Sequence, residues 1–311
     1  MSKLVIFGAT GQQGRSVLET VRHDAQLCKQ YSVRAITRDI TSKTAKEISN
    51  QGIETVQADI DDPASLDSAL AEAHTVILIT STIYDAHLKS HEYRQVKNVG
   101  DAAVAAGASH IIFSTAVHAS RFWDGRAMDV FDSKAEAEEY LRTLPIQVSL
   151  FAPGMFMQNM TTMMTPRLGP DGGTYTVAGV LDADTKVPLI DVANDSGTYI
   201  AALLRGGEGV VGATLHAATK LYSFSEIVGI ISAVSGKTVR YVRVPDDVYA
   251  GFMDVDQGDR VVSMMRFFEE VGYFGPGTEE LVERTVSIVK GRLTTFEEFA
   301  ERYMKDLGQF A

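Results

Sequence analysis

The chain has 311 residues and a formal net charge of −11, with 45% hydrophobic and 22% charged residues. This length allows a sizeable core in one or two domains, and the acidic balance argues against direct nucleic-acid binding, which needs a basic surface. No run approaches the roughly 18 apolar residues of a membrane helix, and the N-terminus lacks the pattern of a secretory signal. The one cysteine, Cys28, cannot form an internal disulfide, so we expect a reducing compartment, the cytoplasm or alternatively the nucleus.

Short apolar segments alternate with helical patterns in the first half of the chain. Segment 76–79 reads Val-Ile-Leu-Ile, as expected of a strand whose two faces are both covered. The alternation predicts an α/β fold, a Rossmann-type doubly wound parallel sheet that binds its ligand beyond the C-terminal ends of the strands. The predicted strands span residues 3–7, 32–37, 55–58, 75–80, 110–114 and 146–151, and the predicted helices between them span residues 15–23, 43–51, 63–71, 87–106 and 133–144.

The pattern changes after residue 152. Residues 153–173 are irregular and rich in Met and Gly, and residues 187–204 read as a strand followed by a helix. We predict a cofactor-binding domain over residues 1–152, rejoined by residues 187–220, and a smaller α+β lobe over residues 153–311 for a substrate or a partner. The further predicted helices span residues 223–235, 278–290 and 296–307.

A glycine-rich turn connects the first strand to the first helix. In Gly8-Ala9-Thr10-Gly11-Gln12-Gln13-Gly14, the first glycine allows a tight turn, the second lets the backbone approach a pyrophosphate, and the third lets the helix pack on the strand. The helix N-terminus presents N–H groups to the phosphates. The pattern predicts dinucleotide binding by Gly8, Thr10, Gly11, Gln12, Gln13 and Gly14.

The end of the second strand distinguishes the two nicotinamide cofactors, because an acidic residue there binds the ribose of NAD and a basic one accepts the 2′-phosphate of NADP. Here Arg38 follows Thr37, and Lys43 is a second cation nearby. A planar guanidinium suits phosphate, so these residues predict NADP(H). Asp59, after the third strand, either contacts the adenine or serves as a turn residue.

Three features together resemble the NmrA-like family of atypical short-chain dehydrogenases/reductases. They are the G-x-x-G-x-x-G turn, the segment 131–141 with its single lysine, and the segment 151–159, Phe-Ala-Pro-Gly-Met-Phe-Met-Gln-Asn; segment 187–192 also fits. The resemblance covers nearly the whole chain. It implies that Lys134 lies near the nicotinamide ribose and that Pro153, Phe156 and Asn159 approach the nicotinamide, with Thr80 as a further cofactor contact.

The catalytic tyrosine of typical members of that superfamily is missing. It stands four residues before the lysine, on the same helix face, and transfers a proton, but Val130 occupies that position here. Lys134 can still orient the nicotinamide ribose, or alternatively pair with Glu138 on the surface. Ser114 and Thr115 fall where the superfamily places its catalytic serine, so they either line the site or cap the strand.

Other candidate residues have weaker sequence support. His118 and Tyr84 are loop residues that could move a proton or have no role. The methionines of residues 155–164 could form a pocket wall, a partner surface or core filling. No group of His, Cys or Asp has the spacing of metal ligands, so we predict no metal site.

Two functions are compatible with this pattern. The first is an NADP(H)-binding redox sensor that regulates a protein partner, which the absent tyrosine and the family resemblance favour. The second is an NADPH-dependent reductase of a small aromatic or quinone-like substrate, since hydride transfer needs only the cofactor ring near an acceptor. Retention of Lys134 favours the reductase.

Overall fold

The computed structural model describes residues 1–207 and 210–310, without the side chains of residues 255 and 256. Its main sheet has seven strands in the order β11-β6-β5-β4-β1-β2-β3, and every neighbouring pair is parallel. The predicted doubly wound parallel sheet is thereby confirmed. The strands are β1 Ser2–Phe7, β2 Tyr31–Thr37, β3 Glu54–Gln57, β4 Ala73–Leu78, β5 His110–Ser114, β6 Gln147–Pro153 and β11 Thr214–Ala217.

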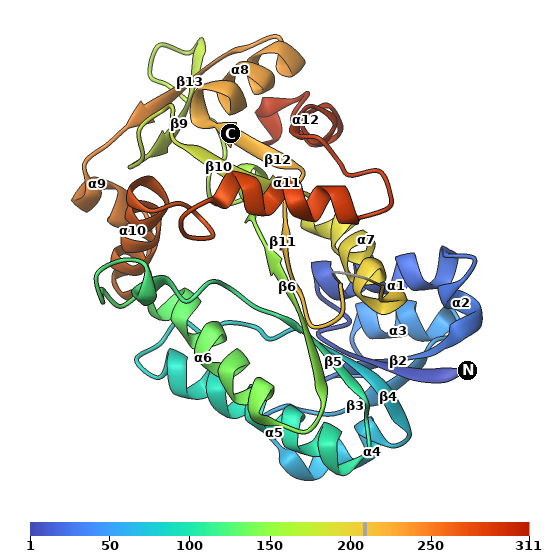
Figure 1. Ribbon diagram of the computed structural model, residues 1–311. Helices are drawn as coiled ribbons and strands as arrows, with labels where there is room; N and C mark the ends of the chain where they lie inside the picture. The colour runs from blue at the N-terminus through green and yellow to red at the C-terminus, as the bar shows by residue number, and fades with distance from the viewer. Residues whose placement is uncertain (208–209, 311) are drawn as a thin grey trace.

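Helices cover both faces of this sheet (Figure 1). Side chains alternate along a strand, so Leu4 and Ile6 of β1 pack into one core, and Val5 and Phe7 pack into another. The first core is closed by α1 Gln12–His23, α2 Leu27–Gln30, α3 Lys43–Asn50 and α7 Val192–Arg205, and the second by α4 Pro63–Leu70, α5 Leu88–Ala105 and α6 Asp129–Thr143. The strands are therefore buried on both sides, as their continuous apolar sequences indicate.

A smaller lobe lies above the main sheet in Figure 1. It contains two three-stranded sheets, β12-β10-β7 and β13-β9-β8. Their strands are β7 Met155–Phe156, β8 Arg167–Leu168, β9 Thr174–Gly179, β10 Lys186–Ile190, β12 Lys220–Ser223 and β13 Thr238–Arg243. The lobe's helices are α8 Phe224–Ser235, α9 Asp246–Ala250, α10 Val255–Glu270, α11 Thr278–Ile288 and α12 Phe296–Tyr303, and short 3-10 turns span Ala119–Arg121, Met157–Thr161 and Leu307–Phe310.

The segment expected to rejoin the first domain divides between the two parts. Strand β10 pairs with β12 and β7 in the smaller lobe, rather than joining the main sheet. Helix α7 and strand β11 do belong to the first domain, because β11 pairs with β6 and α7 packs on α1. At the crossing of these helices, a Cβ on Gly197 would lie 2.3 Å from the Ser16 carbonyl oxygen. Only glycine fits this crossing.

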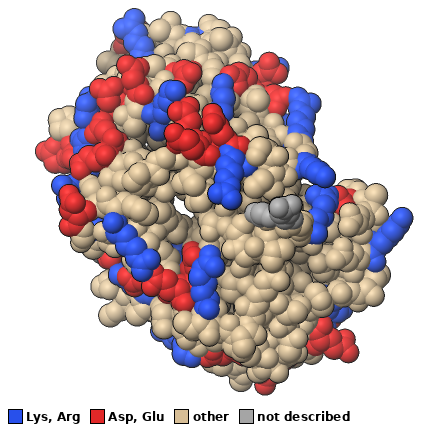
Figure 2. Space-filling model, in the orientation of Figure 1, with Lys and Arg blue, Asp and Glu red and all other residues tan. Residues whose placement is uncertain are grey.

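Within the described residues, no helix is both long and apolar enough to span a bilayer. The same part of the chain contains no group of three or more His, Cys, Asp and Glu residues placed to hold a metal ion. On the face shown in Figure 2, acidic and basic side chains are interspersed, and the surface is hollowed near its centre.

Candidate functional site

A cavity of about 320 Å³ opens at the C-terminal ends of β1 to β4. The glycine-rich turn forms one wall, with Gly8 at φ 78° in the region that favours glycine. A Cβ on Gly14 would lie 2.3 Å from the Gly8 carbonyl oxygen, so Gly14 lets α1 begin directly against the turn. The residues predicted to bind the cofactor that line this cavity are Gly8, Thr10, Gly11, Gln12, Gln13, Thr37, Arg38, Asp59 and Phe156.

The predicted 2′-phosphate contacts have different surroundings. Arg38 is exposed and lines the cavity. The Thr37 hydroxyl donates to the Asp39 carbonyl oxygen at 3.2 Å. The Lys43 side chain is 92% exposed, lies 4.0 Å from Glu47 and lines neither this cavity nor the one beside it. Arg38 is therefore the cation that the fold brings to this end of the cavity.

Asp59 is a turn residue that also forms part of the cavity wall. It lines the cavity, and its carboxylate accepts a hydrogen bond from the Asp61 backbone N–H at 3.0 Å. The Asp61 carboxylate in turn accepts one from the Gln95 amide at 2.8 Å. Gln95 also lines this cavity, although no sequence pattern selected it.

A second cavity, of about 390 Å³, adjoins the first, because Gln13 and Phe156 line both. The Ser114 hydroxyl donates to the Gln13 amide oxygen at 2.9 Å, which ties the end of β5 to the glycine-rich turn. Eight of the predicted catalytic and cofactor-binding residues meet in this second cavity, namely Gln13, Thr80, Ser114, Thr115, Lys134, Pro153, Phe156 and Asn159.

Lys134 is the centre of a polar network in the wall of this cavity. Its ammonium donates to the Thr80 hydroxyl at 2.9 Å and forms an ion pair with Glu92. The other Glu92 oxygen accepts from the Ser133 hydroxyl at 3.1 Å. The Lys134 and Glu92 side chains are 17% and 3% exposed, so two helices and the end of β4 fix the ammonium in place.

The surface pairing of Lys134 with Glu138 does not occur. The Glu138 carboxylate instead accepts from the Thr115 hydroxyl at 3.1 Å and from Arg142 at 2.9 Å. Val130, at the position of the superfamily tyrosine, lines the cavity as an apolar surface. Lys134 therefore faces the cavity without a phenol one turn before it on its helix.

The rest of the second cavity is mostly apolar and comes largely from the smaller lobe. Helices α9 and α10 and the turn after α10 supply residues that the sequence analysis missed, namely Tyr249, Val261, Met264, Met265, Phe268, Tyr273 and Phe274. The methionine-rich segment is divided: Met155, Met163 and Met164 line the cavity, whereas Met157 and Met160 are fully buried in the core. This apolar lining suits a planar hydrophobic molecule.

The two loop residues considered for proton transfer differ in position. Tyr84 lines the second cavity. His118 does not line it, and its Nδ1 instead lies 3.1 Å from the Glu139 carboxylate. The structure thus brings Tyr84, but not His118, to the site.

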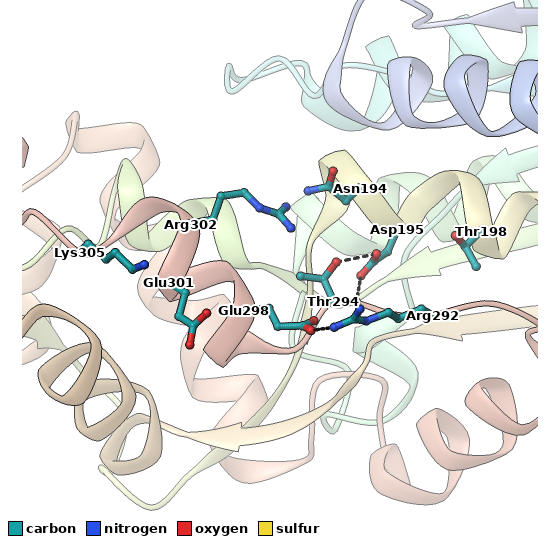
Figure 3. Close-up of a pocket in the computed structure, with 9 residues that line it drawn as sticks. All are labelled: Asn194, Asp195, Thr198, Arg292, Thr294, Glu298, Glu301, Arg302 and Lys305. Atoms are coloured by element: carbon teal, nitrogen blue, oxygen red, sulfur yellow. Dashed lines mark hydrogen bonds and ion pairs between the residues drawn. The ribbon is translucent and has the colours of Figure 1, made fainter.

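A third cavity, of about 550 Å³, lies between α7 and α12 and is lined by charged residues. Two of its charged side chains, Arg292 and Glu298, form an ion pair with each other (Figure 3). Arg302 lies 3.6 Å from Asp191, and Asp195 accepts two hydrogen bonds from Thr294. None of the residues selected from the sequence lines this cavity, so it is a weaker candidate than the two beside the glycine-rich turn.

Relatives with similar sequences are described as oxidoreductases. The NmrA-like family domain-containing oxidoreductase malD of Malbranchea aurantiaca is 28% identical over 254 residues, which cover 78% of this chain and 75% of the relative. The corresponding oxidoreductase FrzB of Cladobotryum sp is 26% identical over 314 residues, covering 93% and 92%.

Solved structures share the fold over nearly the full chain. NmrA, a negative transcriptional regulator, has a TM-score of 0.82 at 21% identity, with 97% of this chain and 95% of NmrA covered, and it has been solved with NADP and with NAD. An NADPH-dependent quinone oxidoreductase of Escherichia coli, in complex with NADPH, has a TM-score of 0.76 at 23% identity, with 96% and 99% covered. The NmrA-like family model matches residues 1–300, which confirms the resemblance, and the chain therefore belongs to the NmrA-like family.

Proposed function

We propose that this protein binds NADP(H) in the first cavity and reduces a planar, largely apolar acceptor in the second. The observation that carries the proposal is the direct junction of the two cavities at Gln13 and Phe156. A cofactor seated on the glycine-rich turn would extend its nicotinamide toward that junction. The oxidoreductases among the relatives support this function.

The residues of the first cavity fit the cofactor. The backbone at Gly11 is open, since a Cβ there would meet only the Gly8 carbonyl oxygen, at 3.4 Å. No side chain caps the N-terminus of α1, so its N–H groups are available to a pyrophosphate. Arg38 is placed to accept the 2′-phosphate, which favours NADP(H) over NAD(H).

When bound, NADPH supplies the hydride. Lys134 would donate hydrogen bonds from Nζ to the nicotinamide ribose or to the acceptor, and Nζ would supply the proton that an acceptor oxygen gains after hydride transfer. Glu92 and Thr80 hold Nζ in that position. The apolar wall from α10 excludes water from the reacting groups.

A redox-sensing regulator, the first function predicted from the sequence, remains the alternative. It is supported by the absent tyrosine and by the shared fold with NmrA. The second cavity favours the reductase, because a sensor of the cofactor alone has no need of an apolar chamber beside the nicotinamide end.

The deciding experiment is a steady-state assay of NADPH oxidation with a panel of quinones. We expect turnover that Lys134→Ala slows at least tenfold, by misplacing the ribose and removing a proton donor. Lys89→Ala, which removes a more exposed ion pair on the neighbouring helix, should leave the rate unchanged. Tight NADPH binding without turnover across the panel would contradict the reductase and favour the sensor.

A further inference from the structure

Three phenol groups line the second cavity, those of Tyr84, Tyr249 and Tyr273. Tyr84 follows β4, and Tyr273 follows α10; both line the cavity. The Tyr273 ring is stacked on Phe268, with ring centroids 4.4 Å apart, and meets the edge of Phe131 at 5.5 Å. These contacts fix the ring and leave it little freedom to turn its hydroxyl elsewhere.

Neither the Tyr84 nor the Tyr273 hydroxyl makes a hydrogen bond within the described part of the chain, in contrast to the hydroxyls of three other tyrosines. Tyr199, Tyr222 and Tyr241 each donate to a carbonyl or carboxylate oxygen. Tyr273 is only 9% exposed, but its hydroxyl oxygen is not fully buried. This oxygen is therefore accessible from the cavity. An unpaired polar group in an apolar wall costs free energy unless a ligand satisfies it.

Both phenols line the same cavity as Thr80 and Lys134 of the polar network. Burial raises the pKa of Tyr273, and the neighbouring Tyr84 raises it further. Burial likewise raises the pKa of Tyr84, with an added contribution from the Glu92 carboxylate and an opposing one from Arg260. Both phenols are therefore neutral near pH 7 and can donate hydrogen bonds.

We propose that the hydroxyls of Tyr84 and Tyr273 bind an oxygen atom of the substrate, so that the cavity selects oxygen-bearing aromatic molecules over hydrocarbons of the same shape. A site built to hydrogen-bond a substrate oxygen rejects an analogue without it, because its own polar groups are then left unpaired. The inference rests on the proposed function only for the location of the substrate cavity.

The test is equilibrium dialysis of the NADP-saturated protein with naphthalene and with 1-naphthol. The quantity measured is the ratio of the two affinities. In the double variant Tyr84→Phe/Tyr273→Phe, we expect the preference for 1-naphthol to fall roughly tenfold, with naphthalene binding retained. Tyr303→Phe, a 40% exposed tyrosine that does not line this cavity, should leave the ratio unchanged.

Each other outcome overturns the inference. An unchanged affinity ratio in the double variant means that the tyrosine hydroxyls do not bind the oxygen of 1-naphthol. An affinity ratio that falls only in Lys134→Ala means that Lys134 binds this oxygen instead. Failure of the wild type to bind either probe also contradicts it. If the double variant loses naphthalene binding through misfolding, Tyr84→Phe alone, at a 44% exposed position, must still lower the ratio.

Dialysis requires no turnover, so the two proposals can fail separately. A protein that prefers 1-naphthol but oxidises no NADPH would overturn the reductase alone. An active reductase whose double variant keeps the preference would overturn the tyrosine assignment alone.

Discussion

The Lys134 ammonium and the Glu92 carboxylate form an ion pair between α6 and α5, and the Glu92 side chain is only 3% exposed. A carboxylate this deep is tolerated because Ser133 and Thr80 also donate to it. The Lys134–Glu92 pair therefore ties α6 to α5 in the wall of the second cavity.

Glu92→Gln is expected to destabilise the fold and slow the reaction. Removing one partner of a buried ion pair costs about 3–5 kcal/mol, and glutamine recovers part of that by accepting hydrogen bonds. We expect a loss of about 2 kcal/mol in the free energy of unfolding and a fall in kcat with little change in KM. Urea denaturation and steady-state kinetics measure both.

The matched control for this variant is Glu136→Gln. Glu136 pairs with Lys89 at 2.6 Å on the same two helices, but its side chain is 39% exposed. Its loss should cost under about 1 kcal/mol. A folded Glu92→Gln protein with unchanged kcat would show that the pair does not position Lys134.

Gly14→Ala is expected to weaken cofactor binding. The added Cβ would lie 2.3 Å from the Gly8 carbonyl oxygen, so α1 must move away from the turn and its N–H groups away from the pyrophosphate. We expect the Kd for NADPH to rise at least tenfold in fluorescence titrations. Gly229→Ala in α8, where a Cβ meets nothing within 4 Å, should leave the Kd unchanged and raise helix stability by up to about 1 kcal/mol.

Arg38→Ala is expected to reduce discrimination between the two cofactors. Loss of a charge-assisted contact to phosphate costs about 1.5–3 kcal/mol, so the Kd for NADPH should rise roughly tenfold to a hundredfold while that for NADH changes little. Lys43→Ala tests the second predicted cation, and its exposed position predicts a small effect. Equal weakening of NADPH and NADH by Arg38→Ala would contradict the assignment.

Asp195 is expected to make stability depend on pH. Burial raises its pKa from 3.8 to about 6, against the lowering effect of its hydrogen bonds from Thr294. Between these values the folded chain holds a proton that the unfolded chain has released, so stability from this group falls as the pH rises through that window. The shift corresponds to about 3 kcal/mol.

Other carboxylates titrate in the same pH range. The contribution of Asp195 is therefore measured as the difference between the wild type and a variant that lacks this carboxyl group. Asp195→Asn keeps the shape of the side chain and removes the titration. The free energy of unfolding of the wild type minus that of Asp195→Asn should decrease from about pH 4 to about pH 7. A difference that stays flat over this range would show that the carboxyl has an ordinary pKa when folded.

The parts of the fold that follow from local sequence were predictable. Apolar runs and glycine endings located most strands and helices of the first domain to within a few residues, but not the short α2 and β11. Helix α10 was missed because Gly258 and several acidic residues interrupt its pattern. The structure explains the glycine, because a Cβ on Gly258 would lie 2.5 Å from the Ala250 carbonyl oxygen. The packing of α10 against α9, which a sequence pattern does not reveal, therefore determines that residue.

The candidate site shows the same division. Motifs located the glycine-rich turn and Lys134, but the partner of Lys134 was not selected, although a signal was present. Glu92 lies four residues before Val96 and four after Leu88, on the face that α5 buries. An acid in an apolar stripe indicates a buried cation partner. Which sheet β10 joins, by contrast, depends on long-range pairing that no strand pattern specifies.

The close crossing of α7 on α1 at Gly197 and Ser16 makes the cofactor-binding module discontinuous in the chain. Without residues 192–217, the apolar face of α1, with Val17 and Leu18, would be left uncovered. A graft that exchanges substrate preference between relatives therefore has to replace two separate inserts, residues 154–191 and 218–310, and keep the stretch between them with its own N-terminal half.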